Sequence, residues 1–282
     1  MRITAAIGVI DEIECLQACV DHHAAIGIEC FVITDLGSTD GTKDLLSSLS
    51  QRANIRVLDG CQSLTESEWP QAMQQFAYQC FRPEYIVYID PDEFWLPASG
   101  KLLQHYGQFD VITPARYNVI PDSRLAAGDW RMHEPLLDRI VFRQRLMFSP
   151  DQQLDHTTPV IRYAPGPKVM HKAVPASIAA GWHGAESELL QKRASPNDLI
   201  ILHFPVSTYE RFRRKVANAE TYLDENRHRL GPNEAWHWRI WVRAHRDRRL
   251  RESYDSQVFT DEQISGFVQS GVGCPARDIF PK

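Results

Sequence analysis

The sequence contains no C-x-x-C pair, no long apolar run and no excess of basic residues. Its six cysteines are scattered, so neither a disulfide framework nor a zinc-binding cysteine cluster is expected. A membrane-spanning helix needs roughly 18 to 20 apolar residues in a row, and no such run is present. The chain opens directly on an apolar, strand-like segment at residues 3–10, which does not resemble a signal peptide. We therefore expect a cytoplasmic protein with reduced thiols, whose only membrane contact would be peripheral to the inner face.

Charge and composition exclude further classes. The 282 residues include 31 Lys and Arg against 36 Asp and Glu, a formal net charge of −5, which gives no general case for nucleic-acid binding. With 43% hydrophobic and 24% charged residues the chain has ordinary globular composition, which excludes disorder. The phosphate-binding pattern G-x-x-x-x-G-K-[ST] is also absent, so a P-loop enzyme is not expected.

The first hundred residues alternate between short β-branched runs and segments of helical period. This alternation is typical of βαβ units that build a mostly parallel sheet. The predicted strands cover residues 3–10, 30–33, 54–58 and 85–89. The predicted helices cover 12–25, a segment that runs through residues 45, 46 and 49, and about 66–80.

The pattern changes beyond residue 97. A further strand is expected at 109–113, whereas 117–167 mixes Pro, Gly, His and Asp and predicts irregular segments with an antiparallel extension. The last third is helical again, with Ser207 as the expected N-cap of a helix through residue 222 and a second helix over 234–251.

An acidic cluster follows the strand at 85–89. Asp90 and Asp92 are separated by one residue, and Glu93 comes next. Ligands of open α/β sheets bind outside the carboxyl ends of the strands, so these carboxylates should lie in a cleft. Carboxylate oxygens are the ligands that Mg²⁺ or Mn²⁺ prefers, and a cation there would neutralise a diphosphate. The alternative is an ordinary turn with solvated acids.

A second polar loop, residues 35–42, follows the strand at 30–33. Asp35 stands at the strand end, where an acid can accept a hydrogen bond from a base N–H or a ribose hydroxyl. The loop would then feed a helix with Asp40 or Thr42 as its N-cap. The alternative is a strand-to-helix turn without a ligand.

These segments together resemble a known family. The residues that carry the resemblance are Ile10-Asp11-Glu12, His22-His23, Gly27-Ile28, the loop 35–42, Tyr88-Ile89-Asp90-Pro91-Asp92-Glu93-Phe94, and Leu202-His203-Phe204-Pro205-Val206-Ser207 followed by Phe212 and Lys215. In this order the chain resembles family 2-type glycosyltransferases, in particular a bacterial subgroup similar to family 92. The resemblance covers most of residues 1–97 and again 168–216.

The resemblance implies a GT-A fold, a Rossmann-like, mostly parallel α/β sheet flanked by helices, with a helical C-terminal part. It implies a glycosyltransferase domain over 1–216, with a nucleotide-sugar-binding half at 1–97 and an acceptor-side half at 98–216, and a helical extension over 217–282. It also implies a nucleotide-sugar donor, usually a UDP-sugar, and a divalent metal, usually Mn²⁺ or else Mg²⁺.

Roles carried over from the family attach to individual residues. Asp35 corresponds to the acid that contacts the base or ribose, Asp90 and Asp92 form the D-x-D that binds metal and diphosphate, and His203 completes the metal site. Relatives more often carry Asn where this chain has Asp11, a departure at the base-contacting position. The residues assigned to donor binding are Asp11, Glu12, Asp35, Ser38, Asp40, Asp90 and Lys215.

Family 2-type enzymes are generally inverting, which implies a carboxylate that removes the proton of the acceptor hydroxyl. Relatives place this base between the D-x-D and the histidine that corresponds to His203, which favours Glu186 as the catalytic base. Asp155, Asp138 and Glu134 remain alternatives.

The acceptor is less well indicated. A glycan, a lipid-linked glycan or another hydroxyl acceptor is expected by default. The segment from Arg239 to Arg251 carries six arginines just after Trp236 and Trp238 and around Trp241, which suits an anionic membrane surface, a lipid-linked acceptor or nucleic acid. Glycosylation of modified bases in DNA would follow from the last possibility. A solvated helix face is the commonest explanation for such a segment.

Two other classes compete with the transferase. Phosphatases of the haloacid dehalogenase type also use D-x-D, but there the motif follows the first strand, whereas Asp90 follows about the fourth. A non-catalytic nucleotide-sugar or glycan-binding protein with a decayed site is the other. Against a decayed site, Asp90, Asp92 and His203 are all present. Turnover of a nucleotide-sugar donor would distinguish an enzyme from a binding protein.

Overall fold

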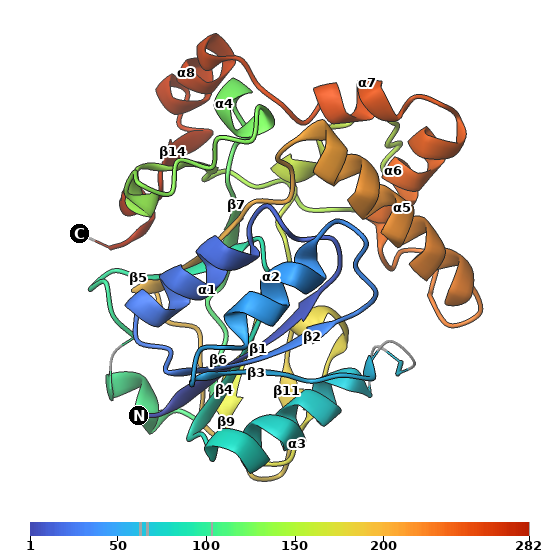
Figure 1. Cartoon of the computed structure of the whole chain (residues 1–282). Coiled ribbons are helices and arrows are strands. Elements are labelled where there is room, and N and C mark those ends of the chain that lie inside the picture. Colours follow the sequence, from blue (N-terminus) through green and yellow to red (C-terminus); the bar gives the residue numbers. More distant parts are fainter. Residues whose placement is uncertain (62–63, 66–67, 103, 282) are drawn as a thin grey trace. The chain divides into compact units, whose positions relative to one another are not determined.

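The computed structural model describes residues 1–61, 64–65, 68–102 and 104–281. The chain forms two compact units (Figure 1). The first contains Met1–Tyr117, Pro165–His203 and Phe280–Lys282, and the second contains Asn118–Ala164 and Phe204–Ile279. This division differs from the predicted boundary at residue 216, because residues 118–164 and 204–216 group with the C-terminal helices. The assignment of donor and acceptor halves stays a prediction.

A seven-stranded sheet forms the centre of the first unit, in the order β12-β6-β9-β4-β1-β2-β3. The strands β1, β2, β3 and β4 run parallel to one another, as the βαβ pattern predicts, and β9 pairs antiparallel to β4. The strands are β1 (Ile3–Val9), β2 (Cys30–Asp35), β3 (Ile55–Val57), β4 (Tyr85–Ile89), β6 (Val111–Ile112), β9 (Met170–Lys172) and β12 (Arg193–Ala194).

Helices cover both faces of this sheet because alternate strand residues are apolar on both sides. Ile7, Phe31 and Val87 belong to one buried cluster with residues of α1 (Leu16–Ala25) and α2 (Thr42–Leu49). Their strand neighbours join a second cluster with α3 (Trp69–Phe81). Figure 1 shows α1 and α2 on one side of the strands and α3 on the other. The predicted start of this third helix, residue 66, lies outside the described residues.

A second, three-stranded sheet has the order β5-β13-β7. Its strands are β5 (Glu93–Pro97), β13 (Leu199–His203) and β7 (Ala115–Asn118). The antiparallel register of β13 on β5 places His203 opposite Glu93. A short hairpin in the same unit consists of β10 (Ser177–Ile178) and β11 (Ala185–Glu186).

The second unit is mainly helical. It contains α4 (Ser123–Ala126), β8 (Ile140–Phe142), α5 (Tyr209–Glu225), α6 (Trp236–Arg246), α7 (Leu250–Asp255), α8 (Asp261–Gln269) and β14 (Gly273–Pro275). The single helix predicted over 234–251 is divided into α6 and α7, because Arg248 adopts a positive φ of 58° between them. Likewise Thr208, not Ser207, caps α5 by accepting a hydrogen bond from the Arg211 N–H. No helix in the described part of the chain is long and apolar enough to cross a membrane.

Candidate functional site

The predicted site residues of the first unit gather where the parallel strands end. Because β1, β2 and β4 are neighbours and parallel, their carboxyl ends lie at one edge of the sheet. Asp11 follows β1, Asp35 ends β2 and Asp90 follows β4. The loops after β1 and β2 and the acidic cluster after β4 therefore share this edge, as predicted for a ligand site.

The loop after β1 is hydrogen-bonded to the loop after β2. The Asp11 N–H donates to Ser38 Oγ at 2.9 Å, and the Thr39 N–H donates to Asp11 Oδ1 at 2.6 Å. Asp11 is buried and has a φ of 56°, a conformation that an Asp tolerates better than most residues. In this structure Asp11 and Ser38 therefore shape the edge of the site by holding the two loops together.

Glu12 and Asp40 extend the same connection. The Glu12 N–H donates to Thr42 Oγ1 at 3.0 Å, and the two carboxylate oxygens of Asp40 accept from the Thr42 N–H at 3.0 Å and the Ile13 N–H at 3.1 Å. The N-cap position of α2 is Gly41, with φ of 100° and no side-chain cap, instead of Asp40 or Thr42 as expected. Asp40, the residue before the N-cap, still accepts a hydrogen bond from the N–H of Thr42 in the first turn of α2.

Asp35 combines loop contacts with a partly open carboxylate. It accepts from the Ser38 N–H at 3.0 Å and the Gly37 N–H at 3.3 Å, and Lys43 Nζ lies 3.9 Å from Oδ2. These donors hold the side chain in one orientation while 10% of it remains exposed. A carboxylate has about four acceptor positions, so Asp35 retains capacity for a donor group of a ligand.

Asp92 and His203 form the central pair of the site. His203 Nε2 lies 3.7 Å from Asp92 Oδ1, and the two side chains are 15% and 3% exposed. The pairing of β13 with β5 causes this proximity, because it puts His203 opposite Glu93, the residue after Asp92. Two residues more than a hundred positions apart in sequence thus meet, whereas the role of His203 as a metal ligand stays a prediction.

Asp90, in contrast, faces a lysine. Lys168 Nζ lies 2.6 Å from Asp90 Oδ2 and 3.6 Å from Glu93 Oε1. Arg116 also forms an ion pair with Glu93. Burial raises the pKa of Glu93 to about 7, with Asp90 and Asp92 adding to the rise, while Lys168 and Arg116 oppose it. Lys168 and Arg116 were not singled out from the sequence; Lys168 lies at the start of the second stretch of family resemblance, the only signal that could have found it.

The donor set at this edge suits a divalent cation only in part. The carboxylate of Asp92 and the imidazole of His203 are oxygen and nitrogen ligands that Mn²⁺ accepts, and they lie together. Within the described residues, no group of three or more His, Cys, Asp or Glu side chains is arranged to hold a metal ion. Asp90, the third predicted ligand, is oriented toward Lys168.

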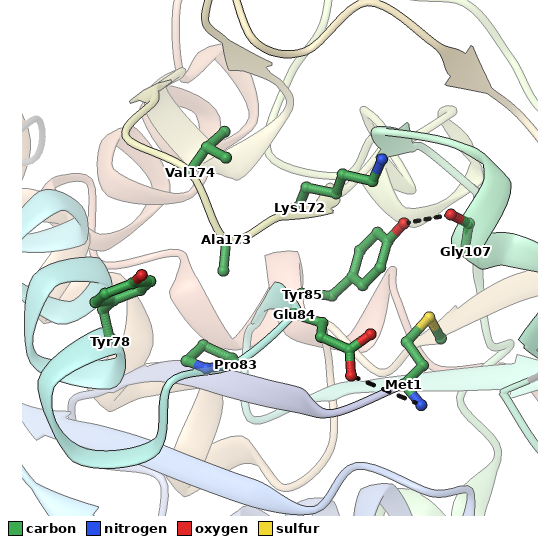
Figure 2. Close-up of a pocket in the computed structure, with 9 residues that line it drawn as sticks. All are labelled: Met1, Tyr78, Pro83, Glu84, Tyr85, Gly107, Lys172, Ala173 and Val174. Carbon is green, nitrogen blue, oxygen red and sulfur yellow. Dashed lines mark hydrogen bonds and ion pairs between the residues drawn. The ribbon is translucent and has the colours of Figure 1, made fainter.

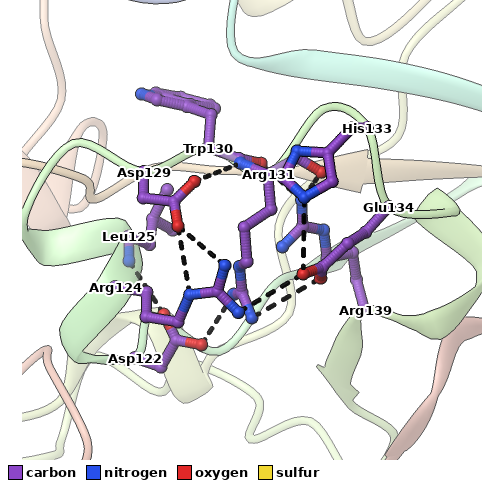
Figure 3. Close-up of polar contacts among 9 residues, drawn as sticks. All are labelled: Asp122, Arg124, Leu125, Asp129, Trp130, Arg131, His133, Glu134 and Arg139. Atoms are coloured by element: carbon purple, nitrogen blue, oxygen red, sulfur yellow. Dashed lines mark hydrogen bonds and ion pairs between the residues drawn. The ribbon is translucent and has the colours of Figure 1, made fainter.

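The candidate bases have other partners. Glu186 on β11 is 76% exposed and pairs with Arg193 at 2.9 Å. In the second unit, Glu134 lies 3.3 Å from Arg124 and 3.8 Å from Arg131 in the ion-pair network of Figure 3. In the same unit Asp138 pairs with Arg277, and Asp155 accepts hydrogen bonds from Thr157 and Thr158. The assignment of Glu186 stays a prediction.

Lys215 and the arginine-rich segment belong to the second unit. Lys215 lies on α5, so its predicted role at the donor stays a prediction. The Trp236 ring stacks on Phe148 with centroids 4.4 Å apart, and Trp241 packs on Phe212 in the core of this unit. Arg246 pairs with Glu220 and Asp224, and two further arginines of the segment pair with acids within α7. These contacts suit an internal structural role, and membrane or nucleic-acid contact by residues 239–251 stays a prediction.

A cavity of about 650 Å³ lies elsewhere, near the amino ends of β1 and β4 (Figure 2). Met1, Glu84 and Tyr85 line it, and the Tyr85 hydroxyl donates to the Gly107 carbonyl at 3.1 Å. The predicted donor residues stand at the opposite ends of these strands. This cavity therefore does not belong to the predicted site.

Comparison with known proteins identifies the class. Residues 5–167 match the family described as Glycosyl transferase family 2. This match covers more than half of the chain, so the chain belongs to that family of glycosyltransferases. The predicted fold class, a GT-A α/β sheet with a helical C-terminal region, is confirmed by the family match and the observed topology. The narrower resemblance to family 92 stays a prediction.

Similar solved structures are distant. The chain is 12% identical to Staphylococcus aureus TarS residues 1–349 in complex with UDP-GlcNAc, covering 96% of this chain and 92% of that one with a TM-score of 0.42. It is 9% identical to GalNAc-T7 with UDP, GalNAc and Mn²⁺, covering 96% and 57%, with a TM-score of 0.43. Against a longer TarS structure, 13% identical with a TM-score of 0.41, the match covers 88% of this chain but only 43% of that one. No curated protein matches the sequence.

Proposed function

We propose that this glycosyltransferase transfers a sugar from a UDP-sugar to a hydroxyl acceptor of a glycan, a lipid-linked glycan or another glycoconjugate, with inversion at the anomeric carbon. The observation that carries the proposal is the Asp92–His203 pair, 3.7 Å apart at the sheet edge that also holds Asp35 and Asp90. Residues at this edge could bind both a nucleoside and a cation that contacts the diphosphate.

Asp35 is the residue proposed to recognise the nucleoside. Its carboxylate is oriented by the Gly37 and Ser38 N–H groups, and an accepting carboxylate matches either the N3–H of uracil or a ribose hydroxyl. Asp11, Glu12, Ser38 and Asp40 support this interaction by holding the two loops that surround Asp35. The preference for UDP among the pyrimidine and purine donors rests on the family resemblance.

A divalent cation, Mn²⁺ or Mg²⁺, is proposed to be held by Asp92 and His203, with Asp90 as the further ligand that the resemblance implies. When bound, such a cation stabilises the negative charge that develops on a diphosphate leaving group. Lys168 holds the Asp90 carboxylate in place and contributes positive charge to the same edge. Burial of Asp92 keeps water away from the pair and strengthens its attraction for a cation.

The test is the release of nucleoside diphosphate from UDP-, GDP- and CDP-sugars, with Mn²⁺ and with chelator. Slow donor hydrolysis needs no knowledge of the acceptor. We expect release from a UDP-sugar in Mn²⁺, loss with chelator, and a decrease of about 100-fold or more in Asp92→Asn. Asp151→Asn, an exposed acid of the second unit, is the matched control and should retain full release.

Calorimetric titration with Mn²⁺ separates metal binding from turnover. Asp92→Asn and His203→Asn should each weaken Mn²⁺ binding. If chelator does not change nucleoside-diphosphate release, the metal dependence is refuted but the transferase activity is not. With methanol as acceptor, proton NMR of the methyl glycoside reports the anomer. Retention of the donor's configuration would overturn the inverting mechanism, and a wild-type chain that releases nothing from any donor would overturn the proposed function.

A further inference from the structure

His183 is held in one orientation by a backbone carbonyl. Its Nδ1 lies 2.5 Å from the carbonyl oxygen of Pro167, and since a carbonyl only accepts, Nδ1 carries the hydrogen and donates. In the neutral ring Nε2 then keeps its lone pair and is a proton acceptor. The residue as a whole is exposed to solvent, although its ring packs against neighbouring backbone.

Two glycines allow this placement of the ring. A Cβ at Gly181 would lie 2.6 Å from His183 Nε2, and a Cβ at Gly166 would lie 2.8 Å from Cε1. Gly181 and the following Trp182 both have positive φ angles, 65° and 60°, and for Trp182 this conformation is strained. The backbone is thus shaped so that the imidazole lies directly against two glycines.

The residue next to the His183 hydrogen-bond partner Pro167 contacts the proposed donor site. Lys168, the residue after Pro167, is the lysine whose Nζ contacts Asp90, and it lies 5.0 Å from the ring centroid of Trp182, the residue before His183. Partial desolvation of the ring, which packs against Gly166 and Gly181, lowers the pKa of His183, and the charges of Lys168 and Arg116 lower it further. The hydrogen bond to Pro167 and the charge of Asp90 raise it. The ring is therefore neutral at pH 7, the form that accepts a proton.

We propose that His183, through Nε2, is the base that deprotonates the acceptor hydroxyl. This inference rests on the proposed function. The acceptor oxygen forms a bond to the anomeric carbon as its proton passes to Nε2. The bond from that carbon to the diphosphate oxygen breaks, and the nucleoside diphosphate leaves with the electron pair. The imidazolium, still donating from Nδ1 to the Pro167 carbonyl, then releases its proton to solvent.

The structure favours His183 over Glu186 for this role. Glu186 is 76% exposed and is already paired with Arg193 at 2.9 Å, so its carboxylate must leave that ion pair to contact an acceptor hydroxyl. His183 instead has an oriented ring, a free accepting nitrogen among the described contacts and a connection through Lys168 to Asp90.

The test uses a variant that keeps the positioning hydrogen bond. In His183→Asn the side-chain amide can still donate to the Pro167 carbonyl, but the basic nitrogen is lost. The probe is nucleoside-diphosphate release from the donor that the wild-type chain uses, with water as acceptor and then with sodium azide. Azide is an anionic nucleophile that needs no base. His228→Asn, an exposed histidine of the second unit, is the matched control.

We expect His183→Asn to lose about 100-fold or more of the release to water, because general-base catalysis contributes at least that factor. Azide should restore release in His183→Asn, and the acidic limb of the pH profile should disappear, neither of which a merely structural role produces. Full release to water in His183→Asn overturns the proposal. The proposal is also overturned if Glu186→Gln, and not His183→Asn, loses release to water and azide restores the release. No release by the wild-type chain overturns the proposed function and the proposal with it, whereas the other two results leave the proposed function standing.

Discussion

Lys168 Nζ lies 2.6 Å from the Asp90 carboxylate, and the lysine side chain is only 2% exposed. The same ammonium is 3.6 Å from Glu93, which is completely buried. A buried ammonium is costly unless acids surround it, and buried acids are equally costly without a cation. The acidic cluster at the end of β4 is therefore stable because a lysine 78 positions later in the chain neutralises part of it.

Replacement of Lys168 by Met should destabilise the first unit strongly. Loss of one partner leaves the carboxylate of Glu93 buried without its neighbouring ammonium, and the free energy of unfolding should fall by about 3 kcal/mol. Asp90 adds little to this loss, since its side chain is 39% exposed and water screens its charge. Urea unfolding at pH 7.5 measures the change.

Lys192→Met is the control for that experiment. Lys192 is exposed, so its replacement should change the unfolding free energy by no more than about 0.5 kcal/mol. Equal effects of the two substitutions would contradict the importance of the buried ammonium.

The sequence predicted those parts of the site that follow the sheet. Asp35 and Asp90 could be placed because an alternating βαβ pattern brings strand ends to one edge. His203 was found only through the resemblance, and the antiparallel register of β13 on β5 gives the physical reason for its position. Lys168 and His183 could not be placed, because both belong to short irregular segments whose path depends on tertiary contacts.

Local signals were less reliable where several residues compete for one role. Asp40 and Thr42 both suit an N-cap, yet Gly41 occupies that position, while the Asp40 carboxylate accepts from both the Thr42 and the Ile13 N–H groups. The arginine-rich segment has the helical period throughout, and nothing in its pattern predicts the left-handed residue Arg248 that separates α6 from α7. Such outcomes depend on contacts that the local sequence does not contain.

Stability should fall on mild acidification because of His171. Burial lowers the pKa of His171 to about 4, and the ring stacks on Tyr88 with centroids 5.8 Å apart. An unfolded histidine has a pKa of about 6.5, so between these values the unfolded chain binds a proton that the native chain does not. The contribution is complete above pH 6.5 and is lost as the pH falls toward 4, by about 3 kcal/mol in total.

His171→Asn tests this dependence. The Asn amide can replace Nδ1, the atom that lies 2.6 Å from the Lys172 carbonyl, but it does not titrate. Urea unfolding at several pH values from 7.5 to 4.5 should give a shallower fall in unfolding free energy for His171→Asn than for the wild type. His133→Asn removes a histidine that is 75% exposed and should leave the slope unchanged. If the unfolding free energy of His171→Asn falls with pH as steeply as that of the wild type, other groups, such as buried His23, cause the loss of stability in acid.

The position of the His183 ring can be disturbed without changing His183 itself. An added methyl group at Gly181 would lie 2.6 Å from Nε2 and must displace the ring, whereas Gly100, with a similar φ of 75°, has nothing within 4 Å of the same position. Both Gly→Ala substitutions incur the left-handed backbone cost of about 1 kcal/mol, so their effects on unfolding by urea should share that component. Only Gly181→Ala should lower donor release to water, by roughly 10-fold or more, because a base must stay within hydrogen-bond reach of the proton that it takes. Equal release by Gly181→Ala and Gly100→Ala would mean that the ring's close approach to Gly181 serves folding alone.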